Sequence, residues 1–281
     1  MAPTERLIDV GEVRLNVAIQ GEGKPVLLLH GFPEFWYSWR HQMDALASAG
    51  FCAIAPDLRG YNKSDKPRDV SAYRLDRIEQ DVVGLLKALG HEKAHVVGHD
   101  WGGALAWTFG ARHGEHVDKL VVMNAPPPGR MLRAFRTRKQ LAKSWYMFFF
   151  QLPFLPERAT RDPNFMRRAL RGMAVNKVRF SDADIARFEE AYAQPGAATG
   201  ALNWYRAAFR YPKVNLKLPP AERPTMLIWG ERDTALGLEL LEGLEPFARD
   251  LRIERIPNAS HWVQQDAPEE VNKLLLQFLR G

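Results

Sequence analysis

The 281-residue chain contains a single cysteine, Cys52. One cysteine forms no internal disulfide, which excludes a disulfide-stapled scaffold. Cys52 lies in the apolar stretch 51–55, so we expect a packed thiol rather than a reactive one. Residues 1–6 lack the apolar segment of a secretion signal, and no run approaches the roughly 20 apolar residues of a membrane span. These absences predict a cytoplasmic protein and argue against association with a membrane.

The formal net charge of +6 is unevenly distributed along the chain. Residues 127–219 hold 18 Lys and Arg against 6 Asp and Glu, whereas the remainder holds 21 against 27. A basic region can indicate a nucleic-acid partner or a membrane surface. Because the chain has no nucleic-acid-binding motif, we interpret the excess as the solvated face of an arginine-rich helical segment and expect no nucleic-acid partner.

Apolar runs alternate with helical patterns along most of the chain. Residues 7–10 and 13–20 alternate apolar and polar side chains, which is typical of an antiparallel hairpin. Continuous apolar runs, typical of strands buried on both faces, occupy 26–29, 51–55, 94–97, 120–123 and 226–229, and a further strand is expected over 251–256. Helical patterns occupy 36–49, 75–89, 104–113, 238–247 and 268–279. The alternation predicts an α/β fold with a mostly parallel sheet flanked by helices.

Residues 130–218 interrupt this alternation. They are rich in arginine and aromatic residues, follow a mostly helical period and contain no buried-strand run. We therefore predict a core domain formed by 1–126 and 220–281, and a helical cap, 127–219, inserted between the sixth and seventh strands. Ligands in open α/β sheets bind at the carboxyl ends of the strands, where this insertion leaves and returns, so the cap should cover the site.

The stretch 98–103, Gly-His-Asp-Trp-Gly-Gly, joins a predicted buried strand to a predicted helix. Small residues on both sides of Asp100 suit a sharp strand-to-helix turn, and the start of a helix favours an anion. Serine hydrolases carry serine at this central position. A carboxylate is already ionised at neutral pH, so Asp100 could attack an sp3 carbon and form an ester, or could merely cap the helix.

Asp233 and His261 each follow a later predicted strand, which gives the chain order nucleophile, acid, histidine. His261, oriented by Asp233, could activate water to hydrolyse the ester, with Glu231 as the rival acid. The backbone N–H groups of Phe32 and Trp101 are the expected oxyanion donors. His30 and His99 adjoin these motifs and are expected to position them, whereas ordinary helix or loop roles are expected for His41, His91, His95, His113 and His116.

The stretches 30–40, 57–61, 98–103 and 202–206 resemble the α/β-hydrolase-fold epoxide hydrolases. The resemblance implies that Asp100 opens an epoxide, that His261 and Asp233 activate the water that releases a vicinal diol, and that two cap tyrosines donate hydrogen bonds to the epoxide oxygen. Tyr205 matches one of them through its Asn-Trp-Tyr-Arg context. Tyr146 matches the other through the aromatic run and Phe-Gln-x-Pro that follow it, with Tyr192 and Tyr211 as the alternatives.

Further positioning residues are expected around the substrate. They are His30, Pro33, Glu34, Trp36, His99, Phe149 and Trp262. The aromatic run 145–150 is interpreted as lining for an apolar substrate tunnel rather than a membrane contact. No metal or other cofactor is needed for this chemistry, the reactants are a small hydrophobic epoxide and water, and a homodimer is the assembly considered. We expect the Phe32–Pro33 bond to be cis, which would aim the Phe32 N–H.

Other functions compete with this interpretation. A haloalkane dehalogenase shares the Asp-Trp pair, but Phe32 stands where its asparagine is expected. A fluoroacetate dehalogenase carries arginines where this chain has Trp101 and Ala104, and a serine esterase needs a serine that the turn lacks. A non-catalytic member of the fold could instead bind a ligand or partner through the basic cap.

Overall fold

The computed structural model describes residues 2–215 and 218–281 and contains one eight-stranded sheet. The strand order is β1-β2-β4-β3-β5-β6-β7-β8. The strands are β1 (Thr4–Asp9), β2 (Arg14–Gln20), β3 (Lys24–Leu29), β4 (Phe51–Pro56), β5 (Ala94–His99), β6 (Val117–Met123), β7 (Thr225–Gly230) and β8 (Leu251–Ile256). β2 pairs antiparallel with β1 and β4, and all other pairs are parallel. This is the predicted fold class.

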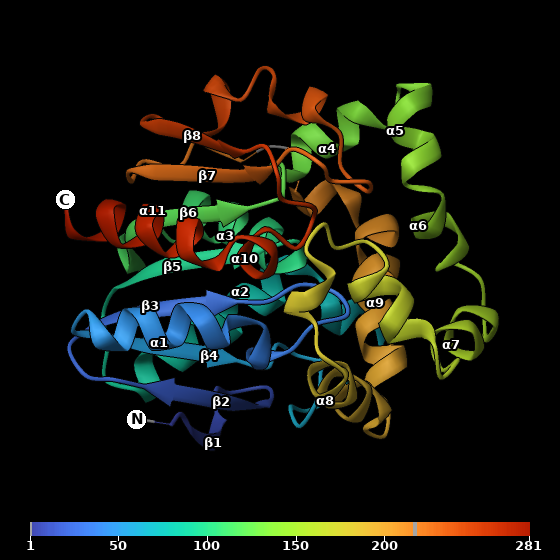
Figure 1. The fold of residues 1–281 in the computed structure, drawn as a ribbon, viewed down its shortest axis with the longest axis horizontal. Helices are drawn as coiled ribbons and strands as arrows, with labels where there is room; N and C mark the ends of the chain where they lie inside the picture. Colours follow the sequence, from blue (N-terminus) through green and yellow to red (C-terminus); the bar gives the residue numbers. More distant parts are fainter. Residues whose placement is uncertain (1, 216–217) are drawn as a thin grey trace.

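Helices cover both faces of the sheet (Figure 1). α1 (Arg40–Ser48), α10 (Val263–Asp266) and α11 (Pro268–Arg280) contact one another on one face, and α2 (Leu75–Ala88) packs with α3 (Trp101–Arg112) on the other. β5 and β7 are buried along their whole length, which explains their continuous apolar runs. The helix expected over 36–49 begins as a 3-10 turn, η1 (Trp36–Trp39), before α1.

The turn between β5 and α3 requires small residues. A Cβ at Gly102 would lie 2.0 Å from the Leu29 carbonyl oxygen, and one at Gly98 would lie 2.2 Å from the Gly102 oxygen. Both approaches are to backbone atoms, which cannot rotate away. The glycines therefore allow α3 to start directly against β3, which places Asp100 above the sheet edge.

The helix predicted over 238–247 is wrong. Two 3-10 turns, η7 (Leu238–Leu241) and η8 (Glu245–Phe247), occupy this segment. Gly243 between them has φ +66°, and Pro246 has no N–H to donate to a helical hydrogen bond. The apolar spacing there reflects contacts with the core rather than a continuous helix.

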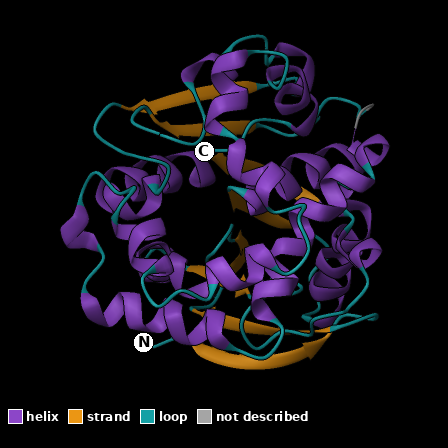
Figure 2. Ribbon diagram, turned by 90° about the vertical axis from the view of Figure 1, so that its right-hand side faces the viewer, coloured by secondary structure: helices purple, strands orange, loops and turns teal. Residues whose placement is uncertain are grey.

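A helical segment separates β6 from β7, as predicted. It consists of α4 (Pro128–Ala134), α5 (Arg138–Lys143), α6 (Trp145–Phe149), α7 (Leu155–Thr160), α8 (Asp182–Ala193) and α9 (Ala197–Arg210), with the short turns η4 (Arg167–Arg171), η5 (Lys177–Arg179) and η6 (Pro212–Asn215). Its described residues contain no strand. Figure 2 shows these helices in front of the strand ends. We propose that 127–219 forms one cap domain; residues 216–217 of that range lie outside the described ones.

Two side chains of α9 hold the cap together and to the core. The Trp204 indole N–H donates to the Arg59 carbonyl oxygen at 2.9 Å. Arg206 binds both carboxylate oxygens of Glu157, at 2.6 and 3.1 Å, and the Phe150 and Leu152 carbonyls. A bidentate guanidinium–carboxylate pair fixes direction as well as distance. α9 therefore sets where α6 and α7 lie above the sheet edge.

His95 is a polar residue of the core whose side chain makes no hydrogen bond. It lies on β5, is fully buried, and neither ring nitrogen has a hydrogen-bond partner. Burial, together with the positive charge of Lys24, lowers the pKa of His95 to about 4. The folded protein therefore keeps this ring neutral, whereas an unfolded chain protonates it below its ordinary pKa of 6.5.

Replacing His95 with leucine should reduce the loss of stability in acid. Because the folded pKa is the lower one, the wild type loses stability as pH falls from 6.5 to 4, by about 3 kcal/mol for this group alone. Urea unfolding measured across that range should show a shallower decline for His95→Leu. Parallel pH profiles for the two proteins would contradict the assignment.

Candidate active site

Asp100 occupies the turn at the end of β5 and has φ +51°, as a sharp strand-to-helix turn requires. Its Oδ1 accepts the backbone N–H of Phe32 at 2.8 Å, and its Oδ2 lies 3.4 Å from His261 Nε2. The Phe32–Pro33 bond is cis, as expected. Burial raises the pKa of Asp100, but hydrogen bonding to His261 and its charge outweigh burial and leave the pKa below its ordinary value. The carboxylate is therefore ionised and faces a histidine.

Asp233 follows β7 and binds His261 directly. The His261 Nδ1–H donates to Asp233 Oδ2 at 2.7 Å, and Oδ1 accepts the N–H groups of Ala235 and Leu236 at 2.8 Å each. Burial raises the pKa of Asp233, yet the charge of His261 and these donors lower it overall. The rival acid Glu231 instead pairs with Arg255 at 2.7 Å. The structure thus brings Asp233, not Glu231, to the histidine.

His261 lies between two buried carboxylates. Burial lowers its pKa, but the charge of Asp233 and the hydrogen bonds to Asp100 and Asp233 raise the pKa well above 6.5. The resting ring is therefore an imidazolium at neutral pH. Loss of the negative charge on Asp100 would remove part of what holds that proton.

Glu34 and His99 link the loop after β3 to the loop after β8, which carries His261. His99 Nδ1 lies 2.7 Å from Glu34 Oε2, and its Nε2–H donates to the His261 carbonyl oxygen at 2.8 Å. Glu34 also accepts the Gly31 N–H at 3.0 Å. His30 donates to the Gly31 carbonyl at 2.9 Å, and burial lowers its pKa to about 4, so this ring is neutral. The three predicted positioning residues therefore act through backbone and loop contacts.

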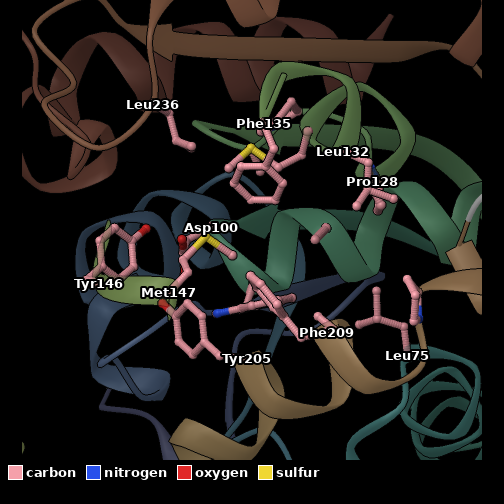
Figure 3. A pocket seen from close by; sticks show the side chains of 17 residues that line it. Leu75, Asp100, Pro128, Leu132, Phe135, Tyr146, Met147, Tyr205, Phe209 and Leu236 are labelled. Atoms are coloured by element: carbon pink, nitrogen blue, oxygen red, sulfur yellow. The ribbon is translucent and has the colours of Figure 1, made fainter. Parts of the chain in front are cut away.

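Two cavity arms meet beside Asp100. One, of about 210 Å³, is mostly apolar and is shown in Figure 3. The other, of about 490 Å³, is lined by Phe32, Pro33, Phe149, His261 and Trp262, among others. Asp100, Tyr146 and Tyr205 line both arms. A substrate that spans the two arms would therefore place its centre at the carboxylate and the two phenols.

Tyr146 and Tyr205 remain protonated in this setting. Burial and the charge of Asp100 raise the pKa of both phenols, well above 10 for Tyr205, where a hydrogen bond with Trp101 works in the opposite direction. Figure 3 shows both side chains pointing to the side of the cavity where Asp100 lies. The Trp101 ring packs against Tyr205 with centroids 4.9 Å apart. The alternatives Tyr192 and Tyr211 line neither arm.

Trp36 lies outside both arms. Its backbone N–H donates to the buried carboxylate of Asp57 at 3.0 Å, and its ring packs against Phe35 and Tyr37. The structure thus places Trp36 away from both arms, and its positioning role stays a prediction. This tryptophan serves the packing of the loop after β3.

Asn124, Gln264 and Lys143 are site residues that the sequence analysis missed. Asn124 Nδ2 donates to Asp233 Oδ2 at 2.8 Å, Gln264 Nε2 donates to Glu34 at 3.1 Å, and Lys143 lines the larger arm. A signal existed for Asn124 alone, because it directly follows β6 and so lies at the same sheet edge as Asp100.

Comparisons with known proteins show the family to which this chain belongs. The model of the α/β-hydrolase fold family matches residues 24–268. The chain is 40% identical to epoxide hydrolase 3 of Xenopus tropicalis, over 98% of this chain and 77% of that protein. It is 38% identical to the AB hydrolase superfamily protein YfhM of Bacillus subtilis, over 98% of each. A solved epoxide hydrolase mutant from Bacillus megaterium, in complex with its product (R)-3-[1]naphthyloxy-propane-1,2-diol, superposes with a TM-score of 0.90 at 32% identity, over 98% of this chain and 100% of that one.

The chain belongs to the epoxide hydrolases of the α/β-hydrolase fold. In the described part of this epoxide hydrolase, no three His, Cys, Asp or Glu side chains gather in a way that could hold a metal ion. Among the same residues, no helix combines the length and hydropathy needed to cross a bilayer.

Asn124→Gly should slow ester hydrolysis without slowing ester formation. Glycine tolerates the positive φ of Asn124, 41°, while the donor that fixes Asp233 Oδ2 is lost, so Asp233 orients His261 less well for the attack of water. We expect about a tenfold lower rate of hydrolysis. Stopped-flow kinetics with an epoxide should show an unchanged first phase and a slower second phase.

Asn62→Gly is the matched control. Asn62 also has a positive φ, 39°, and also donates to a buried aspartate, Asp57, at 2.8 Å, outside the cavity. If both variants slow both phases equally, the effect of Asn124 is structural rather than directed at Asp233.

Proposed function

We propose that this epoxide hydrolase converts epoxides to vicinal diols through a covalent ester on Asp100. The observation that carries the proposal is the convergence of Asp100, His261 and two protonated phenols where the two cavity arms meet. A carboxylate that is ionised at rest needs no base before it attacks. Phenol donors suit a reaction whose leaving group is an alkoxide.

In the first step, an Asp100 oxygen forms a bond to one epoxide carbon, and the carbon–oxygen bond of the ring breaks. The electron pair moves to the epoxide oxygen, which receives a proton from Tyr146 or Tyr205. Because the pKa of both buried phenols is raised, they are protonated and can donate a proton to the epoxide oxygen. Ester formation also removes the charge of Asp100.

In the second step, His261 acts as the base. Without the negative charge of Asp100, less electrostatic energy holds the imidazolium proton, so the His261 pKa falls and the ring can release its proton to the tyrosinate. Neutral His261, held by Asp233, then takes a proton from water as the water oxygen attacks the ester carbonyl. The Phe32 and Trp101 N–H groups are the proposed oxyanion donors. Collapse of the intermediate breaks the bond from the acyl carbon to the alkyl oxygen, the alkoxide takes the remaining proton of the water, and the diol leaves an ionised Asp100 beside a protonated His261.

The mostly apolar lining of both arms supports small hydrophobic epoxides as substrates, with water as the second reactant. Pro33, Phe149 and Trp262 are proposed to contact the substrate, because they line the larger arm. His30, Glu34 and His99 are proposed to position the loops. A cytoplasmic location and a homodimer stay predictions from the sequence.

His261→Gln should trap the ester. Attack by Asp100 needs no base, so the variant should accumulate one covalent adduct whose added mass equals that of the epoxide. Peptide mass spectrometry after incubation with styrene oxide should locate the adduct on Asp100. The double variant Asp100→Asn, His261→Gln is the control and should carry none. An adduct on another residue would refute Asp100 as the nucleophile.

Tyr205→Phe should slow ester formation by about a hundredfold, since loss of one oxyanion-type donor costs about 2.7–4 kcal/mol. The ring contacts with Trp101 and Phe150 persist, so the unfolding free energy should change little. Tyr211→Phe, which removes a phenol outside both arms, is the control and should leave the rate unchanged. Equal first-phase rates for wild type and Tyr205→Phe would remove Tyr205 from the mechanism.

A further inference from the structure

Six large apolar side chains are exposed on one segment of the cap, residues 141–155. Their exposed fractions range from 42% for Leu141 to 85% for Phe154. The six, which we call the cap patch, are Leu141, Trp145, Phe148, Leu152, Phe154 and Leu155. Elsewhere in the described chain only Leu7, Val175, Val178 and Ile253 are comparably exposed. Isolated exposed apolar residues are normal, but a concentration of them marks an interaction surface.

Five of the six members of the cap patch line neither cavity arm, and only Trp145 also lines the larger one. Leu141 lies on α5, Trp145 and Phe148 lie on α6, Leu155 lies on α7, and the other two members lie in the connection before α7. α5, α6 and α7 form the outer edge of the cap, at the right of Figure 1. Met147 and Phe150 on the same stretch are buried, and Phe150 contacts Tyr205 with centroids 5.0 Å apart. Some side chains of the aromatic run 145–150 therefore line the cavity, and others are exposed on the surface.

Phe154 adds a second, independent observation. It has φ +61° and ψ −36°, a region that a non-glycine residue rarely adopts, and its ring is almost fully exposed. Its carbonyl oxygen accepts the Arg158 N–H at 3.1 Å at the start of α7, whereas its ring does not pack against the described hydrophobic core. A strained residue that presents an apolar ring to solvent indicates a surface that is completed by a partner.

The surroundings of the cap patch are strongly basic. Residues 130–161 contain eight Lys and Arg but one acidic residue, Glu157, which pairs with Arg206. Five exposed cations have no acidic group within 4 Å in the described part of the chain: Arg133, Arg136, Arg138, Arg158 and Arg161. Arg138 precedes Leu141 by three residues and Arg158 follows Leu155 by three, so cations flank the patch at both ends. Two such faces would repel each other, whereas an anionic surface complements them.

We infer that the cap patch binds peripherally to an anionic lipid bilayer. Apolar and aromatic side chains that enter the interface, surrounded by Lys and Arg that contact anionic headgroups, are the elements of interfacial binding. The sequence argued against a membrane contact because no segment could span a bilayer, because the basic excess was interpreted as a solvated face and because the run 145–150 was interpreted as tunnel lining. A peripheral contact needs no spanning segment, and Trp145 and Phe148 of that run are exposed.

The cap patch lies where an epoxide could pass from a bilayer into the larger cavity arm, which rests on the proposed function. Trp145 is 65% exposed and also lines the larger cavity arm. This arm therefore reaches the protein surface beside the cap patch. An apolar epoxide dissolved in the bilayer could enter the arm without crossing water.

Sedimentation with vesicles tests the inference without any epoxide. The wild type should sediment with vesicles in which about a third of the lipid is phosphatidylserine, less with pure phosphatidylcholine, and less at high salt. The double variant Phe154→Ser, Leu155→Ser should lower the bound fraction about tenfold. Neither residue lines an arm, so turnover of dissolved styrene oxide should be unchanged, which also shows that the variant folds.

Two further variants sharpen the result. Val178→Ser removes an apolar side chain that is 88% exposed elsewhere on the cap and should bind vesicles like the wild type. Arg138→Gln, Arg158→Gln keeps the apolar side chains and should abolish the preference for anionic vesicles.

Three results would overturn the inference. One is a wild type that sediments with neither vesicle, and another is equal binding by the Phe154→Ser, Leu155→Ser variant. The third is a dimer, detected by light scattering, that this variant dissociates while vesicles leave it intact, because the patch would then be a protein interface. None of these results bears on Asp100 chemistry, so the proposed function stands or fails separately.

Discussion

A protonated histidine between two buried carboxylates is the interaction on which the site depends. Asp100 and Asp233 could not both remain ionised in a buried site unless each had compensating partners. His261 supplies the shared positive charge, at 3.4 Å from Asp100 and 2.7 Å from Asp233. Backbone N–H groups at 2.8 Å, from Phe32 on one side and from Ala235 and Leu236 on the other, supply the rest. The turn after β5, the loop after β7 and the loop after β8 are arranged to hold these three groups together.

The same interaction gives the site its order of events. An ionised Asp100 is ready to attack, while a protonated His261 cannot yet act as a base. In the proposed mechanism, ester formation neutralises Asp100 and lowers the pKa of His261, so His261 becomes a base once there is an ester to hydrolyse. The buried hydrogen bonds of Glu34 and His99 keep His261 in place during the change of charge. One set of residues can thus perform two half-reactions in sequence.

The sequence predicted those parts that follow from strand ends and backbone geometry. Asp100 and Asp233 follow buried apolar runs, His261 follows the partly exposed strand β8, and parallel strands bring their carboxyl ends to one edge. Packing decided the rest. Gly243 and Pro246 interrupt the helix expected over 238–247, and Trp36 packs within the loop after β3. Asn124 donates a hydrogen bond to Asp233, a contact that no periodicity in the sequence predicts. The two faces of the run 145–150 likewise depend on how the five residues of α6 rest on α9.

The central claim is that the oxygen added to the epoxide comes first from Asp100. A single turnover in oxygen-18 water, with enzyme in excess over styrene oxide, tests it most directly. The account predicts an unlabelled diol and one labelled oxygen retained in the peptide that contains Asp100, because water attacks the ester carbonyl and not the epoxide. A labelled diol with an unlabelled Asp100 peptide would contradict it, since water would then have opened the ring directly.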